Sequence, residues 1–234
     1  MSVLYLVRHG QGGTREHYDS LSDLGKAQAR SLGDYFREQG ISFSAAYSGS
    51  LTRQQRTAAE VLPGSSITVD PGWDEFDLSH VYSELAPRLI ADDEQFRIEY
   101  EEMQRDIEAS DGAHHAPVHR KWNGCDKKCV QAWVEARYEY SGESWKAFVQ
   151  RIHGALGRVI QAAHDGNVAV FTSATPIGIS AARTLELTDG RAMWLAAVMF
   201  NASFTTLRVH GSELRLFTMN ATPHLGSAEL RTFR

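Results

Sequence analysis

The sequence predicts an α/β domain with a mostly parallel β-sheet. Two short continuous apolar runs, at residues 3–7 and 168–172, are typical of strands that helices cover on both faces. Each run leads through a polar loop into a segment whose apolar residues recur with helical spacing. Because strand, loop and helix follow one another repeatedly, we expect the strands to pair in parallel.

Helix ends are marked by capping residues in the N-terminal part of the chain. Ser22 is a suitable N-cap for the first helix, and Ser50 is expected to cap the second. The expected elements are a strand at 3–7, a helix at 22–40, a strand at 43–47, a helix at 51–62, a charged helical stretch at 92–108, an amphipathic helix at 145–159, a strand at 168–172, a helix at 177–187 and a hairpin of 204–209 with 214–219.

Three polar residues come directly after expected strands: His9, Ser48 and Ser173. In open α/β sheets, ligands bind at the carboxyl ends of the strands. The sequence therefore predicts that these three residues lie at one edge of the sheet and mark a site.

Length and composition indicate one ordinary-sized domain, because the chain has 234 residues, of which 42% are hydrophobic and 23% charged. The net charge of -5 gives no reason to expect nucleic acid as a partner. The apolar run at 3–7 is too short for a signal segment or a membrane-spanning helix. We therefore expect a cytoplasmic protein with no membrane partner.

Residues 87–141 differ in character from the rest of the chain, and we interpret them as a helical and irregular insertion, or cap, within a single domain of residues 1–234. The stretch contains side chains of metal-ligand type, namely His114, His115, His119, Cys125 and Cys129. Their spacing matches no common zinc pattern, so a structural zinc is the less favoured interpretation. Surface histidines, or basic residues that recognise an anionic substrate, are the alternatives. No metal or organic cofactor is assigned.

Arg8 and His9 form the first candidate site. A neutral imidazole keeps a lone pair near pH 7 and can attack phosphorus. The neighbouring guanidinium can hold two phosphoryl oxygens with parallel hydrogen bonds. The alternative is an arginine and a histidine that simply face solvent at the end of a strand.

Arg53 is placed unusually, in the first turn of a helix. A cation there opposes the helix dipole at a cost of roughly 0.3–1 kcal/mol. A bound phosphate would reverse that cost, because the same helix end attracts anions. An exposed arginine that points away from the helix end is the alternative.

Glu75 lies in an acidic cluster interleaved with two aromatic residues, in the segment 72–77. A carboxyl group beside apolar rings has its charged form disfavoured, which suits a general acid. Asp74 and Asp77 are rival candidates, and a solvated acidic loop is the non-functional alternative.

Several short motifs, in this order and spacing, resemble those of the histidine phosphatase (phosphoglycerate mutase-like) superfamily. They are LYLVRHGQ at 4–11, LSDLGKAQA at 21–29, SGSLTR at 48–53 with Thr-Ala at 57–58, DEF at 74–76, GES at 142–144 and the stretch 220–225. The resemblance covers most of the chain outside 87–141. It implies a three-layer α/β/α sandwich with a helical insertion.

The resemblance also implies roles for individual residues. His9 would attack phosphorus and carry the phosphoryl group, while Glu75 would protonate the leaving alcohol and then activate water. The phosphoryl oxygens would be bound by the side chains of Arg8, Gln11, Arg53 and Ser173.

Ser173 is a departure from the family pattern, which has a second histidine at this position. A serine hydroxyl can still donate a hydrogen bond to a phosphoryl oxygen, but it supplies no positive charge. Two histidines elsewhere, His80 and His224, are candidates to compensate, and Thr172 and Thr175 offer further hydroxyl donors.

Three functions fit these residues. Hydrolysis of a phosphorylated small molecule through a phosphohistidine on His9 is the leading hypothesis. A cofactor-dependent phosphoglycerate mutase is the rival, although mutases of the family usually begin RHGES-x-W-N, and this chain has RHGQGGTRE. A non-catalytic protein that binds phosphorylated ligands is the third. No feature of the sequence indicates an oligomeric state.

Overall fold

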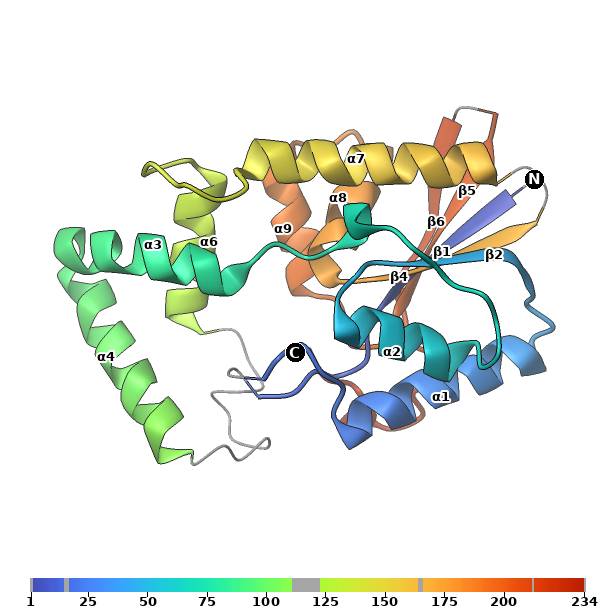
Figure 1. The fold of residues 1–234 in the computed structure, drawn as a ribbon, viewed down its shortest axis with the longest axis horizontal. Coiled ribbons are helices and arrows are strands. Elements are labelled where there is room, and N and C mark those ends of the chain that lie inside the picture. Colours follow the sequence, from blue (N-terminus) through green and yellow to red (C-terminus); the bar gives the residue numbers. More distant parts are fainter. Residues whose placement is uncertain (1, 15–16, 111–122, 164–165, 212, 234) are drawn as a thin grey trace. The chain divides into compact units, whose positions relative to one another are not determined.

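The computed structural model describes residues 2–14, 17–110, 123–163, 166–211 and 213–233 (Figure 1). The elements in chain order are β1 (Ser2–Arg8), α1 (Asp23–Glu38), β2 (Phe43–Ser48), α2 (Thr52–Val61), β3 (Thr68–Val69), η1 (Pro71–Trp73), α3 (Leu78–Asp92), α4 (Glu94–Ala109), α6 (Gly124–Val134), α7 (Trp145–Ala162), β4 (Asn167–Thr172), α8 (Ala174–Thr184), α9 (Asp189–Ala197), β5 (Phe204–His210), β6 (Glu213–Ala221) and η2 (Ala228–Leu230).

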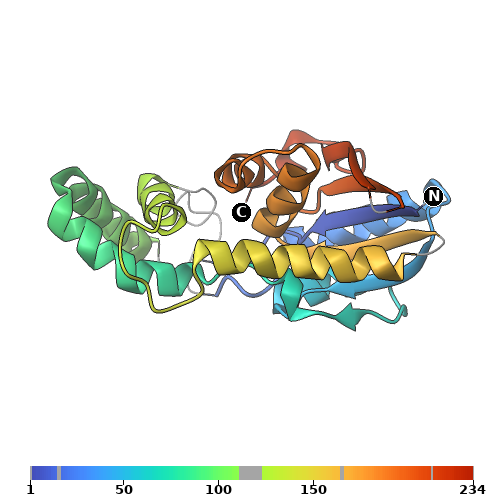
Figure 2. The same cartoon turned by 90° about the horizontal axis from the view of Figure 1, so that it is seen from above.

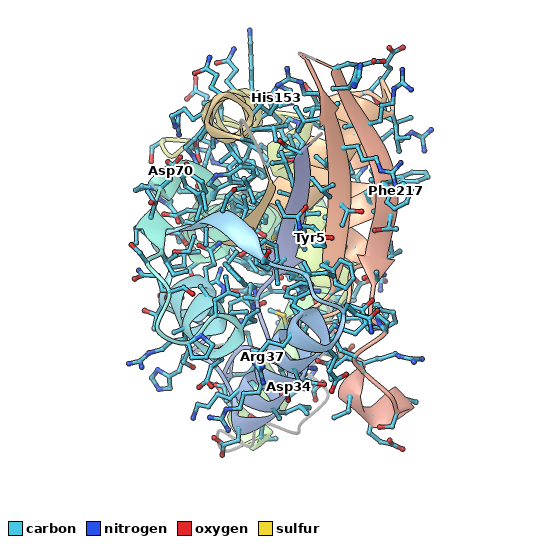
Figure 3. The ribbon with its side chains drawn as sticks, turned by 90° about the vertical axis from the view of Figure 1, so that its right-hand side faces the viewer. Tyr5, Asp34, Arg37, Asp70, His153 and Phe217 are labelled. Carbon is cyan, nitrogen blue, oxygen red and sulfur yellow. The ribbon has the colours of Figure 1, made fainter. Side chains whose placement is uncertain are left out.

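The six strands form one sheet in the order β3-β2-β4-β1-β5-β6. β3, β2, β4 and β1 pair in parallel, whereas β5 is antiparallel to β1 and to β6. This arrangement confirms the mostly parallel sheet and the C-terminal hairpin. Figure 3 shows Tyr5 of the central strand β1 between Asp70, which follows one edge strand, and Phe217, which lies on the other.

Helices cover both faces of the sheet, with α1 and α2 on one side and α7 and α8 on the other (Figure 1). The predicted α/β/α sandwich is therefore confirmed. The core between the sheet and the first helix pair is built from aliphatic and aromatic side chains that are at least nine-tenths buried: Val7, Ala29, Leu32, Phe36, Ala46, Ala58, Val61, Ala169, Phe171 and Phe204.

The carboxyl ends of three parallel strands lie level with one another. Arg8 of β1 is paired with Thr172 of β4, and Ser48 of β2 is paired with Phe171 of β4. The residues that follow β1 and β4, His9 and Ser173, therefore lie at the same edge of the sheet, as the sequence predicts.

One helix begins earlier than expected. α8 starts at Ala174, directly after Ser173, whereas the sequence pattern suggests a start near residue 177. The difference arises at Pro176, which resembles a loop residue but lies in the first helical turn, where its missing N–H costs no hydrogen bond. The short helix α9 was not expected at all.

Residues Phe76–Gln150 form a separate compact unit from Met1–Glu75 with Arg151–Phe233. In this unit α3, α4 and α6 pack against one another (Figure 2). An aromatic cluster lies beside them: Phe76, Trp133, Trp145 and Phe148. The predicted insertion at 87–141 falls within the unit, and its first residue, Pro87, lies inside α3.

The metal-ligand candidates of the insertion fall into two groups. His114, His115 and His119 lie outside the described residues, whereas Cys125 and Cys129 are buried thiols of α6. Burial raises the pKa of Cys129 to about 12. Among the residues that the structure describes, no three His, Cys, Asp or Glu side chains are grouped as metal ligands. No described helix is long and apolar enough to cross a membrane.

Two glycines bring the loop after β1 into direct contact with α1. A Cβ atom on Gly25 would lie 2.2 Å from the carbonyl oxygen of Gln11, and one on Gly10 would lie 2.3 Å from the carbonyl oxygen of Gly25. These distances exclude any larger side chain unless the loop moves. The backbone beside His9 is therefore fixed against the helix.

We predict that Gly25→Ala lowers the free energy of unfolding by about 1–3 kcal/mol, because the added methyl group must push the loop away from α1. Urea unfolding measures the change. The matched control is Gly157→Ala in α7, where a Cβ meets nothing within 4 Å. The control should raise the free energy by about 0.5–1 kcal/mol through helix propensity. Equal effects at the two positions would contradict the close packing.

Candidate active site

The backbone of His9 is held from two sides. Its N–H donates to the carbonyl oxygen of Thr172 at 2.9 Å, and its carbonyl oxygen accepts from the backbone N–H of Ala202 at 3.1 Å and from Nδ2 of Asn201 at 3.3 Å. The next N–H, of Gly10, donates to Oγ1 of Thr57 at 3.0 Å. These bonds connect His9 to β4, to α2 and to the loop before β5.

The ring of His9 is buried and neutral. Nδ1 lies 2.7 Å from the carbonyl oxygen of Gly10. A carbonyl oxygen only accepts, so Nδ1 carries the proton and Nε2 keeps its lone pair. Burial, then the charges of Arg53 and Arg8, place the pKa of His9 well below its ordinary value. His9 thus has the protonation state that a nucleophile requires.

Arg53 lies directly beside the free nitrogen of His9. Its Nε is 3.3 Å from Nε2 of His9, and its Nη1 is 3.1 Å from Oδ1 of Asp19. The guanidinium lies over the ring of Tyr18, 4.7 Å from the centroid. A cation beside a neutral imidazole can bind an anion that the imidazole attacks.

The N-terminus of α2 corrects two expectations. The N-cap residue is Leu51, and the Ser50 hydroxyl instead donates to Asp74 at 2.5 Å. The helix end also already holds an anion, because the Asp19 carboxylate accepts from the backbone N–H groups of Thr52 at 3.0 Å and Arg53 at 3.2 Å. The protein's own carboxylate therefore offsets the cost of a cation in the first turn.

Arg8 is almost fully buried, and its guanidinium is oriented by backbone. Nη1 donates to the carbonyl oxygen of Met199, and Nη2 donates to that of Phe233 at 2.6 Å. Its Nε is buried and has no hydrogen-bond partner among the described residues. A buried donor without a partner is costly, and a phosphoryl oxygen would satisfy it.

The three acidic candidates have different partners. The carboxylate of Asp74 accepts from Ser50, and that of Asp77 accepts from the N–H of His80 as the N-cap of α3. Glu75 is the one held at the sheet edge, because its Oε2 accepts from the backbone N–H of Thr175 at 3.2 Å. When ionised, the Glu75 carboxylate also raises the pKa of Arg8, against the lowering of that pKa by burial. Among the three, Glu75 is therefore placed beside the other site residues.

The loop that precedes Glu75 is anchored to α7. Nη1 of Arg151 lies 3.1 Å from the carbonyl oxygens of Pro71, Gly72 and Asp74. A cation at the end of the short helix η1 complements the carbonyl groups that point out of it. The backbone directly before Glu75 is thus held by Arg151, and its carboxylate is held by Thr175.

Ser173 is buried at the N-cap of α8, and its side chain caps no helical N–H. Its Oγ accepts from Nε2 of Gln54 at 2.9 Å. Gln11 follows His9 by two positions in the chain. Its Oε1 accepts from the hydroxyl of Ser22, the confirmed N-cap of α1, at 2.9 Å. Phosphate binding by Gln11 stays a prediction.

Comparison with known proteins places this arrangement in a family. Residues 4–125 and 88–222 match the family model of the histidine phosphatase superfamily (branch 1). The chain belongs to this superfamily. One segment is 39% identical over 75 residues to the 2,3-bisphosphoglycerate-dependent phosphoglycerate mutase of Azorhizobium caulinodans. That match covers 28% of this chain and 35% of the mutase, or about a third of the relative's length.

Solved structures share the fold of this histidine phosphatase superfamily member over nearly its whole length. The phosphoserine phosphatase of Entamoeba histolytica bound to 3-phosphoglyceric acid is 19% identical with a TM-score of 0.62, covering 96% of this chain and 100% of that one. The mycobacterial glucosyl-3-phosphoglycerate phosphatase bound to inorganic phosphate is 22% identical with a TM-score of 0.62, covering 96% and 99%. The alpha-ribazole phosphatase of Shigella flexneri is 16% identical with a TM-score of 0.60, covering 94% and 96%.

The two histidines considered as substitutes for the family's second histidine have other partners. His224 packs against Tyr35 and Phe204 in the core, and burial lowers its pKa to about 4. Nε2 of His80 pairs with Glu84 at 2.7 Å in the other compact unit. His224 is therefore a neutral core residue rather than a cation in the site.

Several residues of this site were missed from the sequence. Asp19 and Tyr18 contact Arg53 from a loop more than 30 positions away, and no pattern in that loop marks them. Gln54 could have been found, because it lies on the buried face of α2 that helical spacing gives to Thr57, Ala58 and Val61. A buried amide on an apolar helix face requires a hydrogen-bond partner.

We predict that the ring of His9 stays neutral, with its proton on Nδ1, as the pH falls from 7 through its ordinary pKa of about 6.5. The unfolded chain binds a proton there below about pH 6.5 and the folded chain does not, so His9 lowers the free energy of unfolding as the pH decreases. Arg53→Met should raise the pKa of His9, since a neighbouring cation is removed.

Nitrogen-15 NMR titration of the imidazole measures the pKa and the tautomer of His9 directly. The control is Arg158→Met, because Arg158 is exposed and pairs with Asp70. It should leave the pKa of His9 unchanged. A ring that titrates alike in the wild type and in Arg53→Met would disprove the electrostatic account.

Proposed function

We propose that the protein hydrolyses phosphate monoesters of small molecules through a phosphohistidine on His9. The observation that carries the proposal is the neutral His9 ring, whose Nε2 lies 3.3 Å from Nε of Arg53. The buried and unpartnered Nε of Arg8 supplies a second donor for the same anion.

In the first half of the reaction, the lone pair of Nε2 attacks phosphorus in line with the bond to the ester oxygen. A nitrogen–phosphorus bond forms, the phosphorus–oxygen bond breaks, and Glu75 gives its proton to the departing alcohol. Gly10 keeps accepting from Nδ1–H and so stabilises the positive ring of the intermediate. Arg8 and Arg53 stabilise the charge on the phosphoryl oxygens.

In the second half, water attacks phosphorus on the side opposite Nε2. Glu75 takes a proton from the water, the nitrogen–phosphorus bond breaks, and inorganic phosphate leaves. His9 returns to its neutral form, with its lone pair on Nε2. Each group ends in the state in which it began.

A phosphoglycerate mutase is the second candidate, supported by the 39% identity over 75 residues to the mutase of Azorhizobium caulinodans. The sequence after Gly10 favours a phosphatase, because it reads QGGTRE where mutases of the family usually read ES-x-W-N. An assay for phosphoryl exchange between the 2- and 3-positions of phosphoglycerate separates the two.

We predict that brief incubation with a labelled phosphomonoester leaves acid-labile, base-stable label on His9, and that His9→Ala abolishes both label and turnover. The control is His210→Ala, since His210 is exposed at the end of β5. It should keep full activity. Binding of phosphate without any label on the wild-type protein would favour the non-catalytic binder instead.

We predict that Glu75→Gln lowers kcat about 10²–10⁴-fold for alkyl phosphates, whose leaving group needs a proton. The loss should be much smaller with p-nitrophenyl phosphate, because nitrophenolate leaves without one. Glu60→Gln is the control, since Glu60 pairs with Arg30 on the surface. Steady-state kinetics with both substrates provide the measurement, and an equal loss with both would rule out proton donation by Glu75.

A further inference from the structure

Gln54 is a fully buried amide on α2, next to Arg53 in the chain. Its Nε2 donates to Oγ of Ser173 at 2.9 Å and to the carbonyl oxygen of Trp73 at 3.2 Å. Its Oε1 is buried without a hydrogen-bond partner among the described residues. Leaving an amide oxygen without a hydrogen bond costs free energy. The two hydrogen bonds of Nε2 therefore hold the amide in this orientation despite that cost.

The orientation of the amide is fixed by Trp73. A carbonyl oxygen can only accept, so the nitrogen of Gln54 must face it, and a flipped amide would set two oxygens against each other. The same carbonyl oxygen also accepts from the hydroxyl of Thr172 at 2.5 Å. Gln54 is therefore a donor toward Ser173 and never an acceptor.

This fixes the role of the Ser173 hydroxyl. A serine oxygen accepts and also donates, and its hydrogen normally rotates toward whichever acceptor is available. Here the bond from Gln54 uses the acceptor side of Oγ. No acceptor for the Ser173 hydrogen is found in the part of the chain that the structure describes.

Ser173 also lies at the same edge of the sheet as His9, directly after the strand that pairs with β1. The pairing of Arg8 with Thr172 sets Ser173 level with His9, and the N–H of Thr175 holds Glu75 two residues further on. We propose that Gln54 is a positioning residue that turns the Ser173 hydroxyl into a hydrogen-bond donor for the phosphoryl group bound at His9. The inference rests on the proposed function, since it assigns a donor within the same site.

The physical reason is that Ser173 brings a hydroxyl group and no charge to this position of the site. A hydroxyl helps the reaction only if its hydrogen is not used by a neighbouring side chain. Gln54 turns its nitrogen, and not its oxygen, toward Ser173, so it accepts nothing from the hydroxyl and leaves that hydrogen for the phosphoryl group. Transition-state charge is then met by two guanidinium groups, the oriented hydroxyl and the N-terminus of α8.

The test is a double-mutant cycle of Gln54→Met and Ser173→Ala, with kcat and KM measured on p-nitrophenyl phosphate. Loss of one oriented donor costs about 10²–10³-fold in kcat, so Ser173→Ala should fall in that range. Gln54→Met should cost about tenfold or more alone and almost nothing when added to Ser173→Ala. The losses should appear in kcat and leave KM nearly unchanged. A purely structural role would change both constants or lower the amount of active enzyme.

Equal losses from Gln54→Met in both backgrounds would overturn the inference, because Gln54 would then act without Ser173. If Gln54→Met does not fold, Ser173→Ala still decides, since an unchanged kcat would show that the hydroxyl does not serve the reaction. The proposed function fails separately, through absence of label on His9 in the wild-type protein. A labelled enzyme with an additive cycle refutes only the role of Gln54.

Discussion

The hydrogen bond from Nδ1–H of His9 to the carbonyl oxygen of Gly10 decides which ring nitrogen keeps its lone pair. With the proton on Nδ1, the lone pair on Nε2 meets Arg53, and burial together with the nearby guanidinium charges keeps the ring neutral. The other features of the site follow from this constraint. Reversing the tautomer would turn the lone pair toward the backbone and leave Arg53 facing an N–H group.

The fold maintains that tautomer by fixing the backbone around His9. Parallel pairing of β1 with β4, the Thr57 hydroxyl on Gly10 and the contact between Gly10 and Gly25 each hold a different part of the loop. These contacts come from β4, α2 and α1, which are far apart in the sequence. The position of the Gly10 carbonyl oxygen is therefore a product of the whole α/β core rather than of the local sequence.

Most strands and helices of the α/β core are predictable from the sequence, because buried parallel strands and amphipathic helices have different apolar spacings. The short strand β3, the helices α3 and α9 and the order of strands in the sheet are not. The placement of His9 and Ser173 at one sheet edge follows from their positions directly after two parallel strands. The hydrogen-bond partners of the individual side chains are not predictable from the sequence. Ser50 is of a residue type that commonly caps helices, yet its hydroxyl donates to the carboxylate of Asp74. The N-terminus of α2 is capped by the carboxylate of Asp19 instead.

Long-range contacts of this kind depend on side-chain geometry that no local pattern encodes. Asp19 reaches α2 from a loop, and the carbonyl oxygen of Phe233 reaches Arg8 from the other end of the chain. Gln54 is predictable only in part. Its position in the helix predicts that its side chain is buried, but not that it bonds to Ser173. The sequence therefore predicts which residues gather at the sheet edge, while the structure shows their hydrogen-bond partners.

We infer that one phosphoryl group is held by Arg8 and Arg53 and is approached by Nε2 of His9. A crystal structure with orthovanadate would reveal this arrangement, because vanadate adopts the five-coordinate geometry of phosphoryl transfer. We expect vanadium bonded to Nε2 of His9, with its oxygens contacting Nε of Arg8, the guanidinium of Arg53 and the hydroxyl of Ser173. Vanadate bound through another residue, or bound without contact to either guanidinium group, would contradict the account.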